Sequence, residues 1–108
     1  MNYTIHITKT AERDLVRARD YIAFVLKNPT VSEHLLDVAE KEISALSVFP
    51  ESGVLVDEPV LNEWGVRFII VNNYVAFYII EGNIVHIVRF LYGKRDWITI
   101  LKTGYNIE

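Results

Sequence analysis

Basic and aromatic side chains gather near the end of the chain, from Arg89 to Trp97. This segment reads Arg-Phe-Leu-Tyr-Gly-Lys-Arg-Asp-Trp. Guanidinium groups offer a fixed fork of donors to phosphate or carboxylate, and aromatic rings offer flat surfaces to bases or partner side chains. The segment is therefore a candidate binding site. Arginines on a sheet are also common as solvated residues whose aliphatic stems cover apolar neighbours, so the pattern alone leaves both interpretations open.

The residues that metal sites, cysteine nucleophiles and phosphate-binding loops require are missing or do not have the necessary spacing. The chain has no cysteine, which excludes thiolate metal sites and cysteine nucleophiles. His6, His34 and His86 show no paired spacing, so no metal site is predicted, and His86 is expected in the core. The glycines are isolated and no carboxylate pair stands out, which argues against a phosphate-binding loop and against acid/base chemistry. No cofactor is expected.

Length and composition predict one domain over residues 1–108. A chain of 108 residues that is 51% hydrophobic can form a core without disulfides or metal. The N-terminus lacks the features of a signal peptide and no apolar run approaches the roughly 20 residues of a membrane span, so we expect a cytoplasmic protein with no membrane partner. The formal net charge of −3 does not indicate a protein that binds nucleic acid through bulk electrostatics.

The hydrophobic pattern predicts an α+β fold in which a strand is followed by an antiparallel helical hairpin. Alternation indicates a strand over residues 3–8, and spacings of three and four indicate a helix over residues 10–27. Thr30 and Glu33 form a capping-box pattern for a second helix that begins near residue 31. Residues 51–65 read as a loop. A three-stranded antiparallel meander over residues 66–71, 74–80 and 84–91 should pack on the hairpin, before a short helical turn at 96–101.

The turns of the meander set its register. Two-residue turns pair Val71 with Tyr74 and Glu81 with Ile84, whereas a longer second turn would bury a guanidinium. One face is then almost wholly apolar and is expected under the helical hairpin: Phe68, Ile70, Val75, Phe77, Ile79, His86, Val88 and Phe90. The other face, which the hairpin is not expected to cover, carries Arg67, Ile69, Tyr74, Ala76, Tyr78, Ile87, Arg89 and Leu91. Tyr78 then lies opposite Arg67 and diagonal to Arg89.

Several short motifs follow one another along the chain, and their order and spacing are more specific than any one of them. Helix one contains Ala-Glu-Arg-Asp-Leu at residues 11–15, and the turn after helix two is Phe-Pro-Glu-Ser-Gly at residues 49–53. Arg67 opens the next strand, Asn-Tyr-Val-Ala-Phe-Tyr follows at residues 73–78, and Gly-Lys-Arg-Asp closes the sheet at residues 93–96. Across essentially the whole chain, this order resembles the RelE/ParE superfamily of toxins from bacterial type II toxin–antitoxin pairs, and it is closest to the ParE-like branch.

The resemblance implies a plasmid-stabilisation type of toxin that arrests growth and is silenced by a cognate antitoxin in a hetero-oligomer. Antitoxin segments of this family are often acidic, so antitoxin contacts are expected to concentrate on Arg67, Arg89, Lys94 and Arg95. The full set of residues predicted to bind target or antitoxin is Arg67, Tyr78, Arg89, Tyr92, Lys94, Arg95 and Trp97.

The mechanism implied by the resemblance divides. RelE-like members cleave mRNA on the ribosome, whereas ParE-like members are associated with poisoning of DNA gyrase. The RNases carry an arginine after the tyrosine that opens the middle strand, and this chain has Val75 there. Gyrase inhibition is therefore the leading hypothesis and no catalytic residue is assigned. A nuclease would have to use Arg67, Arg89, Arg95 and Tyr105, and a non-toxic binding module with the toxin fold is a third alternative.

Overall fold

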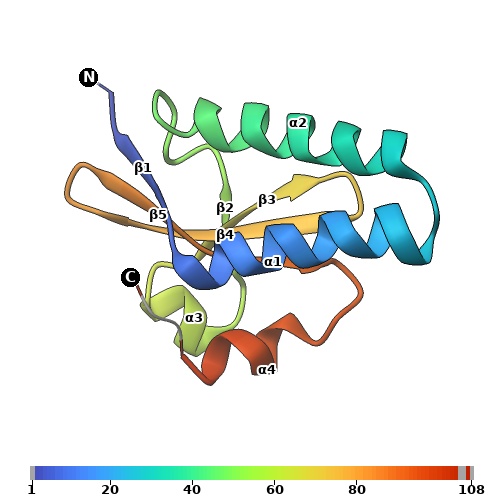
Figure 1. The fold of residues 1–108 in the computed structure, drawn as a ribbon. Helices are drawn as coiled ribbons and strands as arrows, with labels where there is room; N and C mark the ends of the chain where they lie inside the picture. The colour runs from blue at the N-terminus through green and yellow to red at the C-terminus, as the bar shows by residue number, and fades with distance from the viewer. Residues whose placement is uncertain (1, 105–106, 108) are drawn as a thin grey trace.

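The computed structural model describes residues 2–104 and 107, and within them five strands form one sheet in the order β1-β5-β4-β3-β2 (Figure 1). The strands are β1 (Thr4–Ile7), β2 (Val54–Leu55), β3 (Arg67–Val71), β4 (Tyr74–Glu81) and β5 (Ile84–Tyr92). The predicted meander β3-β4-β5 is antiparallel, as expected. The first strand pairs with β5 in parallel and so joins the meander directly.

The helical hairpin follows β1. Helix α1 (Lys9–Asp20) continues into a π-helical segment, η1 (Tyr21–Val25), and α2 (Pro29–Ala45) returns beside them. The predicted capping box at Thr30 is wrong, because the side chain of Asn28 caps α2 by accepting a hydrogen bond of 3.2 Å from the Val31 amide. Pro29 occupies the first helical turn, where no N–H has to be donated within the helix. The Asn-Pro pair thus starts the second helix.

The two tight turns have the predicted length, but β5 contains a β-bulge. Val71 pairs with Tyr74, Glu81 with Ile84 and Arg67 with Tyr78, which confirms the predicted register on both turns. Between Phe77 and Tyr78 the register shifts by one residue, so that Arg89 lies opposite Phe77. The prediction that Arg89 lies diagonal to Tyr78 on a shared face is therefore wrong. The extra residue in β5 also exchanges the predicted faces of Phe90 and Leu91.

The helical hairpin covers the sheet face that was predicted to be open. Apolar side chains of α1, η1 and α2 pack against Ala76, Tyr78, Ile87 and Phe90. The face predicted to be buried under the hairpin is buried in large part, but in a second core on the opposite side of the sheet that contains Phe77, Ile79, Val88 and Leu91. The prediction is wrong for Ile70, which is 67% exposed near the end of β3. Figure 1 shows these layers, with α2 above the sheet, and α3 and α4 below it. Each face of the sheet thus contributes apolar side chains to a core.

The second core is closed by two short helices, α3 (Pro59–Glu63) and α4 (Trp97–Lys102). Helix α4 confirms the helical turn predicted at residues 96–101, and the Asp96 carboxylate caps it by accepting from the Thr99 amide. Residues 51–65, predicted to be a loop, contain β2 and α3. Glu58 caps α3 and Pro59 begins it. This start signal was missed because the helix that follows it is too short to show a periodic apolar pattern. In the part of the chain that the structure describes, no helix is long and apolar enough to cross a membrane.

Candidate partner-binding surface

The first sequence-predicted site residue, Arg89, is held by a buried carboxylate. Strand β1 pairs only with residues 84–87, so the rest of that edge of β5 is left to α1. Asp14 of α1, 5% exposed, accepts two hydrogen bonds from the Arg89 guanidinium, at 2.7 and 3.0 Å, and a third at 3.0 Å from the Phe90 amide. A bidentate charged pair of this kind is strong and directional. It ties α1 to the β-bulge.

Tyr78 and Arg67 hold the Phe-Pro-Glu-Ser-Gly turn in place. The Tyr78 hydroxyl donates to the Pro50 carbonyl at 2.7 Å and accepts from the Gly53 amide at 2.9 Å. Burial raises the pKa of Tyr78 above its usual 10.0, so the hydroxyl keeps its proton for this bond. Arg67 donates to the Gly53 and Glu51 carbonyls at 2.8 and 3.3 Å. These contacts give both side chains a structural task.

Gly53 explains why the turn ends in glycine. A Cβ built at this position would collide with the Tyr78 hydroxyl and would lie 2.8 Å from the Phe68 carbonyl oxygen. Only a residue without a side chain lets the turn approach the sheet so closely. The turn motif that contributed to the resemblance is therefore a packing device that docks the end of α2 onto β3 and β4.

The exit from β5 carries the remaining predicted residues. Tyr92, Lys94 and Arg95 are exposed, and the Arg95 amide donates to the Tyr92 carbonyl at 3.0 Å in a turn. The half-buried ring of Trp97 lies 5.2 Å from that of Phe77, centroid to centroid, and so anchors α4 on the second core. No ion pair joins Lys94 or Arg95 to a carboxylate of the described residues. Of the four predicted site residues in this segment, Tyr92, Lys94 and Arg95 are thus exposed, and Trp97 packs on the core.

A cavity of about 590 Å³ opens beside this exit, between α1, η1, the β3-β4 turn and the end of β5. The Tyr74 ring stacks on Phe90 at 5.1 Å and meets the edge of Tyr92 at 5.7 Å. Burial raises the pKa of Tyr74, with Tyr21 and Tyr92 as smaller causes. The cavity is mainly apolar, and its charged lining residues are Arg17, Arg95 and Asp14, whose carboxylate is already paired with Arg89. It can accept an apolar side chain whose neighbours are acidic.

Sequence reasoning missed the helical side of this cavity. Tyr21, Leu26 and Val31 line it and are exposed. The π-helical segment that begins at Tyr21 also leaves Phe24 74% exposed. The available signal was a run of apolar residues from 21 to 26, longer than one buried stripe of a helix requires. The wider turn of a π-helix was not readable from that run.

A family model described as the ParE toxin of the type II toxin–antitoxin system parDE matches residues 5–97. The chain belongs to this toxin family. A chromosomal ParDE toxin–antitoxin system from P. aeruginosa has a similar structure, with a TM-score of 0.69 at 19% identity over 83% of this chain and 95% of that chain. The RelBE2 toxin–antitoxin complex from Mycobacterium tuberculosis gives a TM-score of 0.59 at 23% identity over 85% of this chain and 99% of that one. These likenesses show the shared fold. No curated relative matches the sequence.

In this ParE-family chain six of the seven predicted site residues fall into two groups, and the seventh, Trp97, packs on the second core. Arg67 and Tyr78, which are paired across β3 and β4, and Arg89, on another part of the sheet, are hydrogen-bonded within the fold. Tyr92 and Arg95 line the cavity, with Lys94 exposed beside them. The predicted role of all these residues in binding stays a prediction. Tyr105, named for the nuclease alternative, lies outside the described residues.

Proposed function

We propose that this ParE-family protein arrests bacterial growth by binding and inhibiting DNA gyrase, and that a cognate antitoxin neutralises it in the cytoplasm. The choice of gyrase as the target rests on the hydrogen bonds that Arg67 and Arg89 make within the fold. A ribosome-dependent nuclease needs free cations around the scissile phosphate and a positioned acid or base. Here Arg89 is paired with Asp14, and Arg67 donates to loop carbonyls.

The position after Tyr74 supports the same choice. Val75 is half-buried and packs against the second core, so it contributes to stability and offers no charge. Of the arginines that the nuclease alternative would use, Arg95 alone has no carboxylate or carbonyl partner within the described residues. One free guanidinium suits binding of a protein target better than phosphodiester cleavage, which also needs a proton-transfer group near it.

An antitoxin partner is supported by the solved relatives and by the surface. The similar structures come from a ParDE toxin–antitoxin system and a RelBE2 toxin–antitoxin complex. On this chain, the cavity beside Tyr92 is rimmed by exposed apolar residues, including Leu26 and Val31. Exposed apolar patches with a polar rim are typical of protein–protein contact sites. A toxin–antitoxin hetero-oligomer would cover this patch.

Two measurements test the proposal. Induced expression without antitoxin should arrest growth, and the purified protein should inhibit supercoiling by purified gyrase. Coexpression with a cognate antitoxin, to be sought as a short reading frame beside the gene, should restore growth. Lys41, exposed on α2, gives the control: Arg95→Ala should weaken inhibition while Lys41→Ala should not. Normal supercoiling beside rapid loss of translation and codon-linked mRNA cuts would establish the nuclease alternative, and harmless expression would establish the non-toxic module.

A further inference from the structure

Two histidines meet on the sheet where β1 pairs with β5. His6 and His86 are partners in the register of this parallel pair, and their Nδ1 atoms lie 2.8 Å apart, with the rings edge to face. His86 is 5% exposed and His6 is half-buried. Ile79 of the second core lies opposite His86 in β4, so the pair sits at the edge of that core. A contact this short between two nitrogens is a hydrogen bond, in which one Nδ1 donates a proton and the other accepts it.

The other ring nitrogen of His86 decides which Nδ1 donates. Nε2 of His86 is buried and has no hydrogen-bond partner among the described residues, and the Glu81 carboxylate lies 3.6 Å from it. A bare nitrogen lone pair is repelled by a negative oxygen, whereas an N–H is attracted to it. The geometry therefore assigns a proton to Nε2 of His86 and leaves its Nδ1 bare. His6 then donates from Nδ1 and has a bare Nε2.

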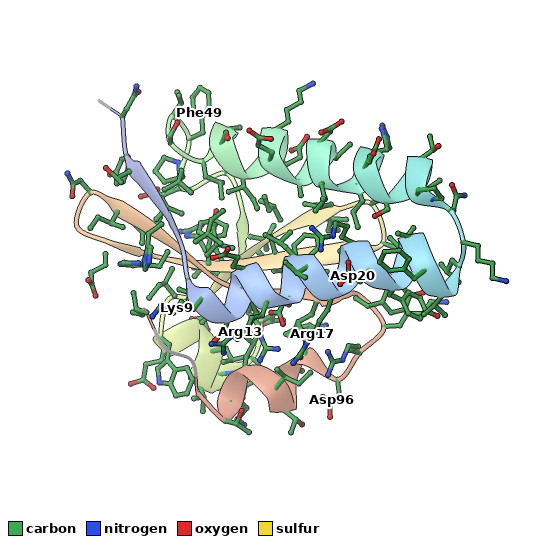
Figure 2. All side chains as sticks on the ribbon, viewed as in Figure 1. Lys9, Arg13, Arg17, Asp20, Phe49 and Asp96 are labelled. Carbon is green, nitrogen blue, oxygen red and sulfur yellow. The ribbon has the colours of Figure 1, made fainter. Side chains whose placement is uncertain are left out.

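The charged groups on the neighbouring elements are few or already paired. In β4, Glu81 is the charged side chain that faces the pair. In α3 and α4, which close the core on this side of the sheet, Glu58 is paired with Lys102 and Glu63 is exposed. Lys9 is exposed at the start of α1, where the chain leaves β1 (Figure 2), and it makes no ion pair with a described residue. The protons that the two imidazoles hold are therefore set mainly by their own contact and by Glu81.

This arrangement accepts a first extra proton but not a second. The first adds an N–H at the bare Nε2 of His6, and the bond between the two Nδ1 atoms becomes a charge-assisted one, which is stronger. A second proton would have to enter between the Nδ1 atoms, where two N–H groups would then point at each other across 2.8 Å. It would break the contact and leave two positive rings side by side, which repel. The two imidazoles therefore titrate as a unit.

The strand that this contact holds is short. Strand β1 has four residues, and it pairs only with residues 84–87 of β5. Its apolar neighbours on the other face, Tyr3 and Ile5, pack on the core beneath the helical hairpin. With so few ladder positions, the bond between the imidazoles is a substantial part of what keeps β1 on the sheet. Loss of this bond would uncover the edge of β5.

We propose that His6 and His86 form an acid-sensitive latch, which holds β1 on the sheet while the pair carries at most one positive charge and releases β1 when a second proton is taken up. The latch belongs to the fold and does not rest on the choice of gyrase as the target. In the unfolded chain both imidazoles take up a proton at the mildly acidic pH where imidazole ordinarily titrates. The folded protein then binds one proton fewer than the unfolded chain, so its stability falls as the pH falls.

Urea unfolding at about pH 7, 6 and 5 measures this difference of one proton. One proton changes the folding equilibrium constant by about tenfold per pH unit. Between pH 6 and 5, the wild type should therefore lose up to about tenfold relative to His6→Gln, in which a side-chain amide that takes up no proton replaces one imidazole. His34→Gln removes an exposed imidazole of α2 and should keep the wild-type dependence. In hydrogen exchange at the lower pH, the protection factors of the β1 amides should fall more than those of β4.

NMR of the labelled imidazole nitrogens tests the assignment on the wild-type protein, so it does not depend on a variant that has to fold. At neutral pH, His86 should carry its proton on Nε2 and His6 on Nδ1, and acidification should add a proton at Nε2 of His6. The proposal is overturned if both Nδ1 atoms become protonated while β1 stays protected, or if His6→Gln shows the same pH dependence as the wild type. A rise of the urea midpoint on addition of zinc, absent from His6→Gln, would show that the Nδ1 atoms share a metal ion instead of a proton and would also overturn it.

Discussion

Removing the Asp14 carboxylate should destabilise the protein more than any other single charge change. Asp14→Ala leaves the Arg89 guanidinium and the Phe90 amide without their acceptor. The side chain of Arg89 is 15% exposed and that of Asp14 is 3% exposed, so water can replace little of what is lost. Breaking a buried ion pair by deleting one partner costs about 3–5 kcal/mol. Water can hydrate the slightly exposed Arg89 guanidinium and so reduce this cost, and we expect a loss of about 3 kcal/mol in the free energy of unfolding. That is a large share of the roughly 5–15 kcal/mol that stabilises a domain.

Urea unfolding followed by circular dichroism measures the loss. Asp20→Ala is the control on the same helix, because its pair with Arg19 is exposed and should be worth less than about 1 kcal/mol. Replacing both Asp14 and Arg89 by Leu and Met should recover much of the loss, since no charge is then left buried alone. Equal urea midpoints for Asp14→Ala and Asp20→Ala would refute the claim that the buried carboxylate ties α1 to the bulge.

Three other features of the fold give direct predictions. Gly53→Ala should cost about 1–3 kcal/mol through its collision with the Tyr78 hydroxyl, and the cost should shrink in a Tyr78→Phe background. His6→Ala should cost about 1–3 kcal/mol, because it removes the 2.8 Å partner of the Nδ1 atom of buried His86. A hydrogen bond from the Leu61 amide of α3 lowers the pKa of Glu58 below its usual 4.5. The contribution of Glu58 to folding stability is therefore complete at neutral pH and is lost as the pH falls through the lowered pKa, and NMR of the α3 amides should detect this loss.

Exposed neighbours provide the references for these substitutions. Ser52→Ala precedes Gly53 and adds no clash, so its unfolding midpoint should stay close to that of the wild type. His34→Ala, on the exposed face of α2, should do the same beside His6→Ala. A Gly53→Ala penalty that is unchanged by Tyr78→Phe would contradict the assigned collision, and a His6→Ala protein as stable as His34→Ala would show that the imidazole pair contributes nothing.

The structure changes how the family motifs are understood. The Phe-Pro-Glu-Ser-Gly turn and Arg67 belong to one set of contacts around Tyr78. Arg89 of β5 belongs to another set around Asp14. These residues identify the family because they build its fold. The free cations lie elsewhere, on one side of α1 and in the exit from β5. The surface that carries these free cations is therefore the better place to look for partner recognition.

The sequence by itself determined the elements that local chemistry controls. Apolar spacing predicted the hairpin and the meander, and the two-residue turns at Asn72 and Gly82 fixed the strand pairing next to them. The order of motifs pointed to the toxin family that the family model then matched. Each of these inferences depends on residues that are neighbours along the chain, where propensity and turn geometry act directly.

Only the tertiary structure decided which sheet face lies under the hairpin. Both faces are apolar, so alternation could not choose between them, and the short helices that cover the second face left little periodic signal. The bulge in β5 moved Arg89 away from Tyr78, and the bond that holds it there joins residues 75 positions apart. A contact of that separation is set by packing of the whole domain. The candidate surface is consequently made of the residues that this packing leaves free: Arg17, Tyr21, Leu26, Tyr92 and Arg95.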